Sequence, residues 1–264
     1  MKKILSIAGS DSSGGAGIQA DIKTIMAHDM YAMSAVTALT AQNTLGVKDV
    51  MEASPEFVEE EIDCIFEDIR PDAVKTGMVS NAGIIKAVVR KLKEYKAENI
   101  VVDPVMVSTS GCELIERNAM DVLINELLTI GTVITPNIPE AEKISGIKIE
   151  DRDDMVKAAE MISRNISGVI LIKGGHLLNE AADLMYCGGK EKWFVSERID
   201  TKNTHGTGCT LSSAIACNLA AGKKPAQAIE DAKAYLTGAL INDPGLGHGC
   251  GPVNHNWVNE RKSK

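Results

Sequence analysis

One stretch of the sequence combines glycine with reactive side chains immediately before a long run of small and apolar residues. It spans 204–210 and contains Gly206, Thr207, Gly208 and Cys209. The glycines let backbone approach a ligand, and the apolar run predicts a helix that begins here. The first N–H groups of a helix lack internal partners and lie at its positive end, so this loop is a candidate anion site. We expect the pKa of the Cys209 thiol to be lowered there.

Two carboxylates and a lysine occur where predicted strands end. Asp103, Glu140 and Lys173 each fall at or just beyond a short apolar run. Carboxylates and water commonly hold Mg²⁺ beside nucleotide phosphates, and a lysine can contact a phosphate as a point charge. Together with an anion hole at 206–209, these groups would support phosphoryl transfer. The ordinary alternatives remain open for each residue: a turn acid, a helix-start charge, a solvated strand end and, at 206–209, a turn that packs a core helix.

A second glycine-rich loop lies near the N-terminus. Ile4–Ala8 predicts a buried strand, the loop 9–17 follows, and a helical stripe of apolar residues covers 18–26. The loop has neither the G-x-x-x-x-G-K-[ST] pattern nor G-x-G-x-x-G, which argues against a Walker A site and against a Rossmann dehydrogenase. Polar side chains such as Asp11 and Ser12 suit a neutral ligand that forms hydrogen bonds.

Strand and helix patterns alternate along the rest of the chain. Further strands are predicted over 32–39, 72–76, 100–103, 133–135 and 169–173, with a hairpin over 183–187 and 192–197. Further helices are predicted over 55–69, 81–95, 117–128, 154–164, 210–221 and 225–242. This order predicts a mostly parallel sheet with helices on both faces, in one domain spanning 1–264.

Ligands bind such sheets beyond the carboxyl ends of the strands. Seven residues fall at or just past a predicted strand end: Asp11, Gln42, Met78, Asp103, Asn137, Glu140 and Lys173. We therefore predict that they meet at one edge of the sheet and form a site.

Composition excludes several classes of function. The net charge of −8 argues against a general nucleic-acid binder, since phosphate neutralisation dominates such affinity. Aromatic residues make up only 3% of the chain, which disfavours a base-stacking surface. The six cysteines form no C-x-x-C pair, and no apolar run approaches the length of a membrane span or signal peptide. We expect a cytoplasmic protein without membrane partners.

Several motifs, in order along the chain, resemble one enzyme family. They cover 8–21, 74–78, 102–106, 135–141, Lys173–His176 and 200–210. This set resembles the hydroxymethylpyrimidine/phosphomethylpyrimidine kinases of thiamine synthesis, in the ribokinase-like superfamily. The resemblance implies a three-layer α/β/α fold, ATP and Mg²⁺, a homodimer, and phosphorylation first of the pyrimidine's hydroxymethyl group and then of the monophosphate.

The resemblance also implies roles for individual residues. A pyrimidine pocket is implied for Gly9, Asp21, Gln42, Met78 and Val105. Nucleotide contacts are implied for Asn137, Lys173 and Thr207, a place near Mg²⁺ for Asp103 and Glu140, and the catalytic anion hole for Gly206, Gly208 and Cys209 beside Lys173. Related sugar kinases carry Asp at the Cys209 position as a base, so the identity of the base is open here.

The sequence leaves two alternative functions for the protein and two alternative roles for His205. A pyridoxine/pyridoxal kinase has a similar sequence and the same Gly-x-Gly-Cys loop. A non-catalytic ligand sensor on the same fold is disfavoured by the intact set of Asp103, Glu140 and Lys173. His205, four residues before Cys209, is either half of a thiol–imidazole pair or part of the loop structure beside the anion hole.

Overall fold

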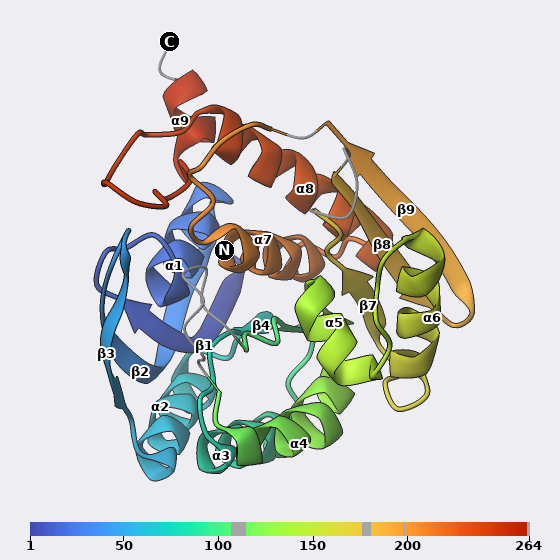
Figure 1. Ribbon diagram of the computed structural model, residues 1–264. Helices are drawn as coiled ribbons and strands as arrows, with labels where there is room; N and C mark the ends of the chain where they lie inside the picture. Colours follow the sequence, from blue (N-terminus) through green and yellow to red (C-terminus); the bar gives the residue numbers. More distant parts are fainter. Residues whose placement is uncertain (107–114, 176–180, 198, 263–264) are drawn as a thin grey trace.

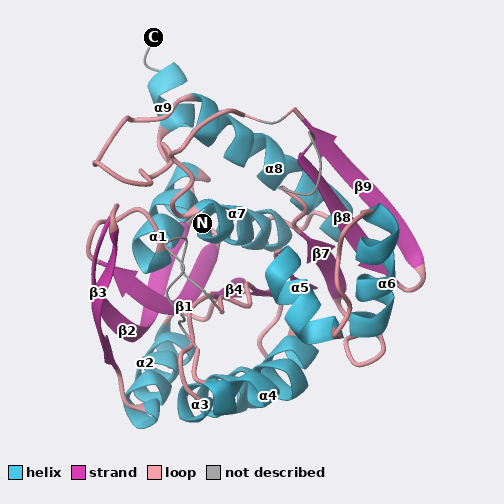
Figure 2. Cartoon of the chain, in the orientation of Figure 1, coloured by secondary structure: helices cyan, strands magenta, loops and turns pink. Residues whose placement is uncertain are grey.

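A computed structural model of the chain describes residues 1–106, 115–175, 181–197 and 199–262. Helices cover both faces of a central sheet (Figure 1, Figure 2). The strands are β1 (Lys3–Asp11), β2 (Tyr31–Asn43), β3 (Gly46–Glu52), β4 (Ala73–Thr76), β5 (Ile100–Val102), β6 (Val133–Ile134), β7 (Val169–Ile172), β8 (Ala181–Cys187) and β9 (Lys190–Ser196). The helices are α1 (Gly17–Ala27), α2 (Pro55–Asp68), α3 (Ala82–Glu94), α4 (Met120–Val122), α5 (Ile138–Ser145), α6 (Arg152–Ser163), α7 (Thr207–Ala220), α8 (Pro225–Ile241) and α9 (Trp257–Lys262).

The described strands form one sheet in the order β3-β2-β1-β4-β5-β6-β7-β8-β9. From β2 through β7 neighbouring strands are parallel, while β3, β8 and β9 pair antiparallel at the two edges. The prediction of a mostly parallel sheet is confirmed, as is the β8–β9 hairpin. The chain order explains most of the pattern, because parallel neighbours need a long crossover connection, whereas two-residue links join the antiparallel pairs β2–β3 and β8–β9.

The strands alternate their side chains between two cores. In β7, Ile170 and Ile172 pack toward α2, α3, α4 and α6, whereas Val169 and Leu171 pack toward α1, α7 and α8. These two groups of helices lie on opposite faces of the sheet (Figure 1). Since both faces are covered, the central strands β5, β6 and β7 are apolar throughout rather than alternating. Helix α7 is buried along nearly its whole length, and its small side chains allow that close packing.

Some elements differ from the sequence prediction. Strand β3 was not predicted, because its side chains are mostly exposed and lack apolar alternation; pairing with β2 holds it. The helix predicted over 117–128 is irregular, with α4 as a single α-helical turn between 3₁₀ and π-helical turns. Helices α5 and α9 were also not predicted. In the described part of the chain, no helix is long and apolar enough to cross a membrane.

Candidate active site

A cavity of about 880 Å³ opens at the carboxyl ends of the parallel strands. All seven residues predicted to meet at this edge line it: Asp11, Gln42, Met78, Asp103, Asn137, Glu140 and Lys173. The loop 204–209 closes one wall. The fold thus brings these residues to one cavity, since parallel strands deliver their carboxyl ends to one edge, and their roles there stay predictions.

The loop before α7 faces the charged residues directly. Gly206 has φ = 82°, a left-handed conformation that favours glycine, and it caps α7. A Cβ added at Gly208 would lie 3.2 Å from Asp103 Oδ2 and 3.5 Å from Lys173 Nζ. The N–H groups of Gly208 and Cys209 lie in the first turn of α7, where no intrahelical carbonyl is available. The geometry therefore places an anion-binding helix end beside an acid and a cation.

Asp103 and Lys173 form an ion pair at the cavity wall. Lys173 Nζ lies 2.8 Å from Asp103 Oδ1, and Thr135 donates a hydrogen bond to the same oxygen at 3.0 Å. Burial opposes the charge on Asp103, but the Lys173 and Lys75 cations outweigh it and hold the pKa of Asp103 below its usual value. Burial likewise opposes the charge on Lys173, while Asp103 and Glu140 raise its pKa. Both side chains are thus charged at neutral pH.

Glu140 combines a structural and a site position. With Asn137 it forms a capping box at the start of α5: Glu140 N donates to Asn137 Oδ1 at 2.9 Å, and Asn137 N donates to Glu140 Oε2 at 2.8 Å. Glu140 therefore lies at a helix start, as the ordinary alternative for this residue predicted, and it also lines the cavity. Burial raises the pKa of Glu140 to about 7; the Lys173 cation opposes this effect and the Asp103 charge adds to it.

The expected lowering of the Cys209 pKa is wrong. Burial raises the pKa of this thiol to about 11, and the nearby Lys75 cation does not compensate because Asp21 and Asp103 add negative charge. The position at the α7 N-terminus, with a hydrogen bond from the Gly17 backbone, is too weak to reverse the burial. Cys209 is a neutral thiol at pH 7, which makes it a poor proton acceptor.

Replacing Cys209 by Ala should therefore leave residual kinase activity. The backbone N–H of residue 209 survives the change, so kcat should fall by no more than the ~100- to 1000-fold typical of losing one oxyanion-hole donor. Steady-state kinetics against pH would measure this. An alkaline pKa that disappears from the wild-type profile on mutation would instead make the thiol the base.

Four of the five predicted pocket residues line the cavity, and the fifth lies behind it. Gly9, Gln42, Met78 and Val105 belong to the cavity wall. Asp21 is not among the lining residues, and its side chain is 0% exposed. The structure brings the first four together and places Asp21 one layer deeper, so a direct substrate contact of Asp21 remains a prediction without support from this geometry.

Asp21 has a buried cation as its partner. Lys75 Nζ lies 2.9 Å and 2.8 Å from the two carboxylate oxygens of Asp21, and Ser213 Oγ donates to Asp21 Oδ1 at 2.8 Å. Despite the cost of burial, the negative charges of Asp21 and Asp103 raise the pKa of Lys75. Sequence reasoning missed Lys75 as part of the site, although a lysine within the apolar strand β4 is an available signal for a buried charge pair.

The residues predicted for a nucleotide also belong to the lining of this cavity. Asn137, Lys173 and Thr207 line it, and Ile199, Leu236 and Leu240 add an apolar wall that sequence reasoning did not identify. His176, part of the motif that begins at Lys173, lies outside the described residues. His205 does not contact Cys209 but binds Asp11, with 2.8 Å between Nε2 and Oδ2, so the loop-structure explanation of His205 is supported.

The fold and the site together define a small-molecule kinase of ribokinase-like architecture. A parallel sheet, an anion-binding helix end and a strand-end acid and lysine pair occur here without a Walker A loop. The phosphomethylpyrimidine kinase family model matches residues 11–254, and the chain belongs to this family.

Individual relatives agree with this assignment. A hydroxymethylpyrimidine/phosphomethylpyrimidine kinase of Bacillus subtilis is 46% identical, with 96% of this chain and 94% of that protein aligned. The thiamine biosynthesis bifunctional protein ThiED of Geobacter sulfurreducens is 49% identical over 96% of this chain, which spans 52% of that protein.

Solved structures cover both kinase types. The phosphomethylpyrimidine kinase of Clostridium difficile has 46% identity and a TM-score of 0.81, covering 90% of this chain and 98% of that one. The pyridoxal kinase of Staphylococcus aureus, solved with AMP-PCP and pyridoxal, has 36% identity and a TM-score of 0.90, covering 98% of this chain and 95% of that one.

Proposed function

We propose that this protein transfers phosphate from ATP to 4-amino-5-hydroxymethyl-2-methylpyrimidine and then to its monophosphate, in thiamine biosynthesis. The observation that carries the proposal is the single cavity that joins a carboxamide, Gln42, to an anion-binding end formed by Gly208, Asp103 and Lys173. The names of its relatives support the pyrimidine as substrate, and the AMP-PCP complex of a neighbour supports ATP as the donor.

In this proposal each site residue has a separate role in phosphoryl transfer. Lys173 presents a cation to the transferring phosphate, and the N–H groups of Gly208 and Cys209 stabilise the negative charge that develops on it. Gln42 binds the polar edge of the acceptor, and Met78, which lies close to Gly9, packs beside the ring. Holding both reactants in one cavity removes much of the entropic barrier.

The acidic residues fit a role in holding Mg²⁺. Asp103 receives two short hydrogen bonds on Oδ1, while the contact of Oδ2 with the described residues is a long one of 3.5 Å from Ser212, so Oδ2 retains capacity for a ligand toward that part of the structure. Among the described residues no cluster of three or more His, Cys, Asp or Glu side chains could hold a metal. Mg²⁺ suits such a site, because it takes one or two carboxylates together with water and phosphate oxygens. When bound, it would neutralise phosphate charge during transfer.

The chain forms one kinase domain in this proposal and works as a cytoplasmic homodimer. The sheet edge at β2 and β3 supports a contact between copies, because Leu39 and Met51 are register partners there with exposures of 48% and 64%. Sedimentation would test it, and a monomer at micromolar concentration would contradict it.

Pyridoxal is the alternative acceptor, favoured by the close structural match to a pyridoxal kinase. Gln42→Met separates the two substrates. A carboxamide offers a donor and an acceptor in one plane, which matches a ring nitrogen beside an exocyclic amine better than the phenol and carbonyl of pyridoxal. We expect the variant to lose at least ~10-fold of pyrimidine turnover, about 1.4 kcal/mol, with pyridoxal turnover unchanged or raised.

A substrate panel with Mg-ATP measures this difference directly. Gln227→Met is the matched control, because Gln227 bonds Asp231 on α8 away from the cavity. Preference of the wild type for pyridoxal, or equal loss of both activities in Gln42→Met, would contradict the pyrimidine assignment.

A further inference from the structure

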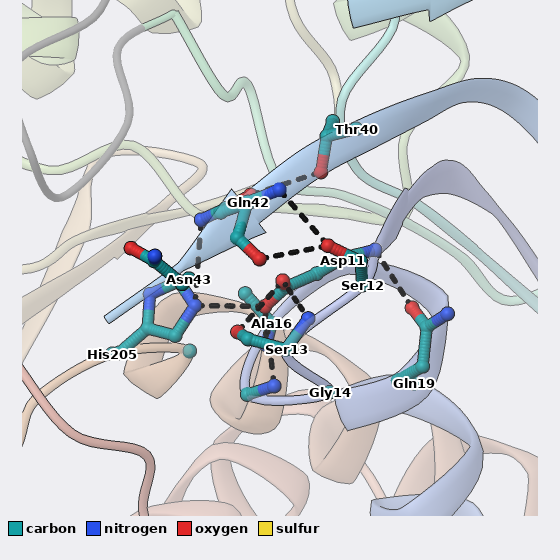
Figure 3. Close-up of polar contacts among 12 residues, drawn as sticks. Asp11, Ser12, Ser13, Gly14, Ala16, Gln19, Thr40, Gln42, Asn43 and His205 are labelled. Atoms are coloured by element: carbon teal, nitrogen blue, oxygen red, sulfur yellow. Dashed lines mark hydrogen bonds and ion pairs between the residues drawn. The ribbon is translucent and has the colours of Figure 1, made fainter. Parts of the chain in front are cut away.

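Two glycine loops that lie far apart in the sequence are packed directly against each other. A Cβ added at Gly206 would lie 1.9 Å from the Gly15 carbonyl oxygen, and one added at Gly15 would lie 2.4 Å from His205 Cδ2. No side chain fits between the loops at either point. A shift of one loop must therefore displace the other, and His205 lies at their contact (Figure 3).

Asp11 organises the first of these loops from inside. Its carboxylate accepts hydrogen bonds from the backbone N–H groups of Ser13 at 2.8 Å, Gly15 at 3.1 Å and Ala16 at 2.8 Å. Although burial opposes its charge, the hydrogen bonds from His205 and these groups lower the pKa of Asp11 to about 2. An ionised Asp11 accepts only, so at the 2.8 Å contact His205 Nε2 must carry a proton and donate it.

The proton on His205 Nε2 limits the hydrogen bonds that the Gln42 carboxamide can form. The amide nitrogen of Gln42 lies 3.4 Å from His205 Nε2, and a ring nitrogen that donates to Asp11 cannot also accept from Gln42 (Figure 3). At its other end Gln42 Oε1 lies 3.1 Å from Thr40 Oγ1, whose single proton it shares with the Ser10 carbonyl at 2.9 Å, and the Gln42 backbone N–H donates to Ser12 Oγ at 2.9 Å. The carboxamide is thus clamped in place while its N–H remains available on the cavity wall.

We propose that Asp11 and His205 are a positioning pair, which presents the Gln42 N–H to a hydrogen-bond acceptor on the substrate ring and holds the anion-hole loop in register with it. The inference rests on the proposed function and adds a specificity element to it. The preferred ligand is a heteroaromatic ring with an unprotonated nitrogen at this point. Neither residue needs to touch the reacting atoms. The proton on His205 Nε2 prevents the imidazole from accepting the Gln42 N–H, and His205 holds Gly206 in place as its neighbour in the chain.

Substitution at His205 should separate positioning from simple packing. His205→Leu removes the donor, whereas His205→Gln keeps an N–H group at about the reach of Nε2. We expect His205→Leu to raise the KM for the pyrimidine at least ~10-fold, which corresponds to the loss of about one hydrogen bond between Gln42 and the ring. The same variant should lower kcat and keep the KM for ATP within ~2-fold of wild type. His205→Gln should recover most of the pyrimidine KM. His248→Leu, at an exposed histidine outside the cavity lining, is the control and should match wild type.

A double-mutant cycle makes the test specific. On the Gln42→Met background, His205→Leu should add little to the pyrimidine KM, because the group that it positions is already absent. Additive effects, equal rises of the KM values for pyrimidine and ATP, or a His205→Gln variant as damaged as His205→Leu would overturn the proposal. If His205→Leu does not fold, the cycle is run with Gly15→Ala, which would push the imidazole aside while leaving its chemistry intact.

Failure of the proposed function gives a different result. Wild-type enzyme that phosphorylates pyridoxal but not the pyrimidine would overturn the assigned substrate. The same cycle measured with pyridoxal would then still decide whether His205 positions Gln42.

Discussion

Replacing Asp103 by Asn together with Glu140 by Gln is expected to lower kcat by about 1000-fold, which corresponds to about 4 kcal/mol of transition-state stabilisation. The physical reason is the loss of the Asp103 charge and of the ionisable Glu140 carboxyl group, which lie near Lys173 and would hold Mg²⁺. Pyrimidine affinity should remain close to wild type, because neither substitution changes Gln42 or Met78, which we propose contact the ring. Steady-state kinetics and calorimetric binding of the pyrimidine measure the two quantities separately.

Glu142→Gln is the matched control for this prediction. Glu142 lies on the same helix, α5, but forms a surface ion pair with Lys148. The kcat of Glu142→Gln should equal that of wild type. Circular dichroism should show that the double variant, Asp103→Asn with Glu140→Gln, is folded. An equal loss of pyrimidine affinity and of kcat in the double variant would mean that the two acids hold the substrate instead.

Lys75→Met is expected to destabilise the protein by about 3–5 kcal/mol, the cost of leaving one partner of a buried ion pair uncompensated. Both Lys75 and Asp21 are 0% exposed, so no water can replace the lost partner. Adding Asp21→Asn should restore part of the stability, since the neutral amide removes the buried charge. Urea unfolding of the single and double variants gives the free energies directly.

The surface pair of Lys157 and Asp154 provides the comparison. Lys157 is 62% exposed, and Lys157→Met should change stability by less than about 1 kcal/mol. If Lys75→Met proves as mild as this control, the buried pair is not a structural element of the site. If the double variant is less stable than Lys75→Met alone, the unpaired Asp21 charge is not the cause of the loss.

The predictions that held were those with a local physical cause. Ser54 and Pro55 mark the start of α2 because capping and a fixed φ act within one turn, and Ser54 Oγ accepts from Phe57 N at 3.2 Å. Short apolar runs of two to four residues placed the central strands β5, β6 and β7. Strand ends then placed Asp103 and Lys173, because chain order and parallel pairing bring those ends to one edge.

The predictions that failed depended on contacts across the chain. Strand β3 has no apolar alternation of its own and exists because β2 offers it a free edge. The lowered pKa expected for Cys209 considered only the helix end next to it in sequence. In the folded protein, burial and the charges of Asp21 and Asp103 dominate, and none of these follows from the residues adjacent to Cys209.

The sequence by itself determined the alternating architecture, the glycine loop that begins α7 and the family, since each depends on residue types at short spacing. Only the tertiary structure decided that Lys75 balances Asp21 beneath the cavity and that His205 meets Asp11, residues separated by 194 positions. It also decided that Gln42 lies beside that pair. The physical reason is that local backbone preferences act over a few residues, whereas desolvation and charge pairing depend on which distant groups the packed sheet and helices bring within about 3 Å of one another.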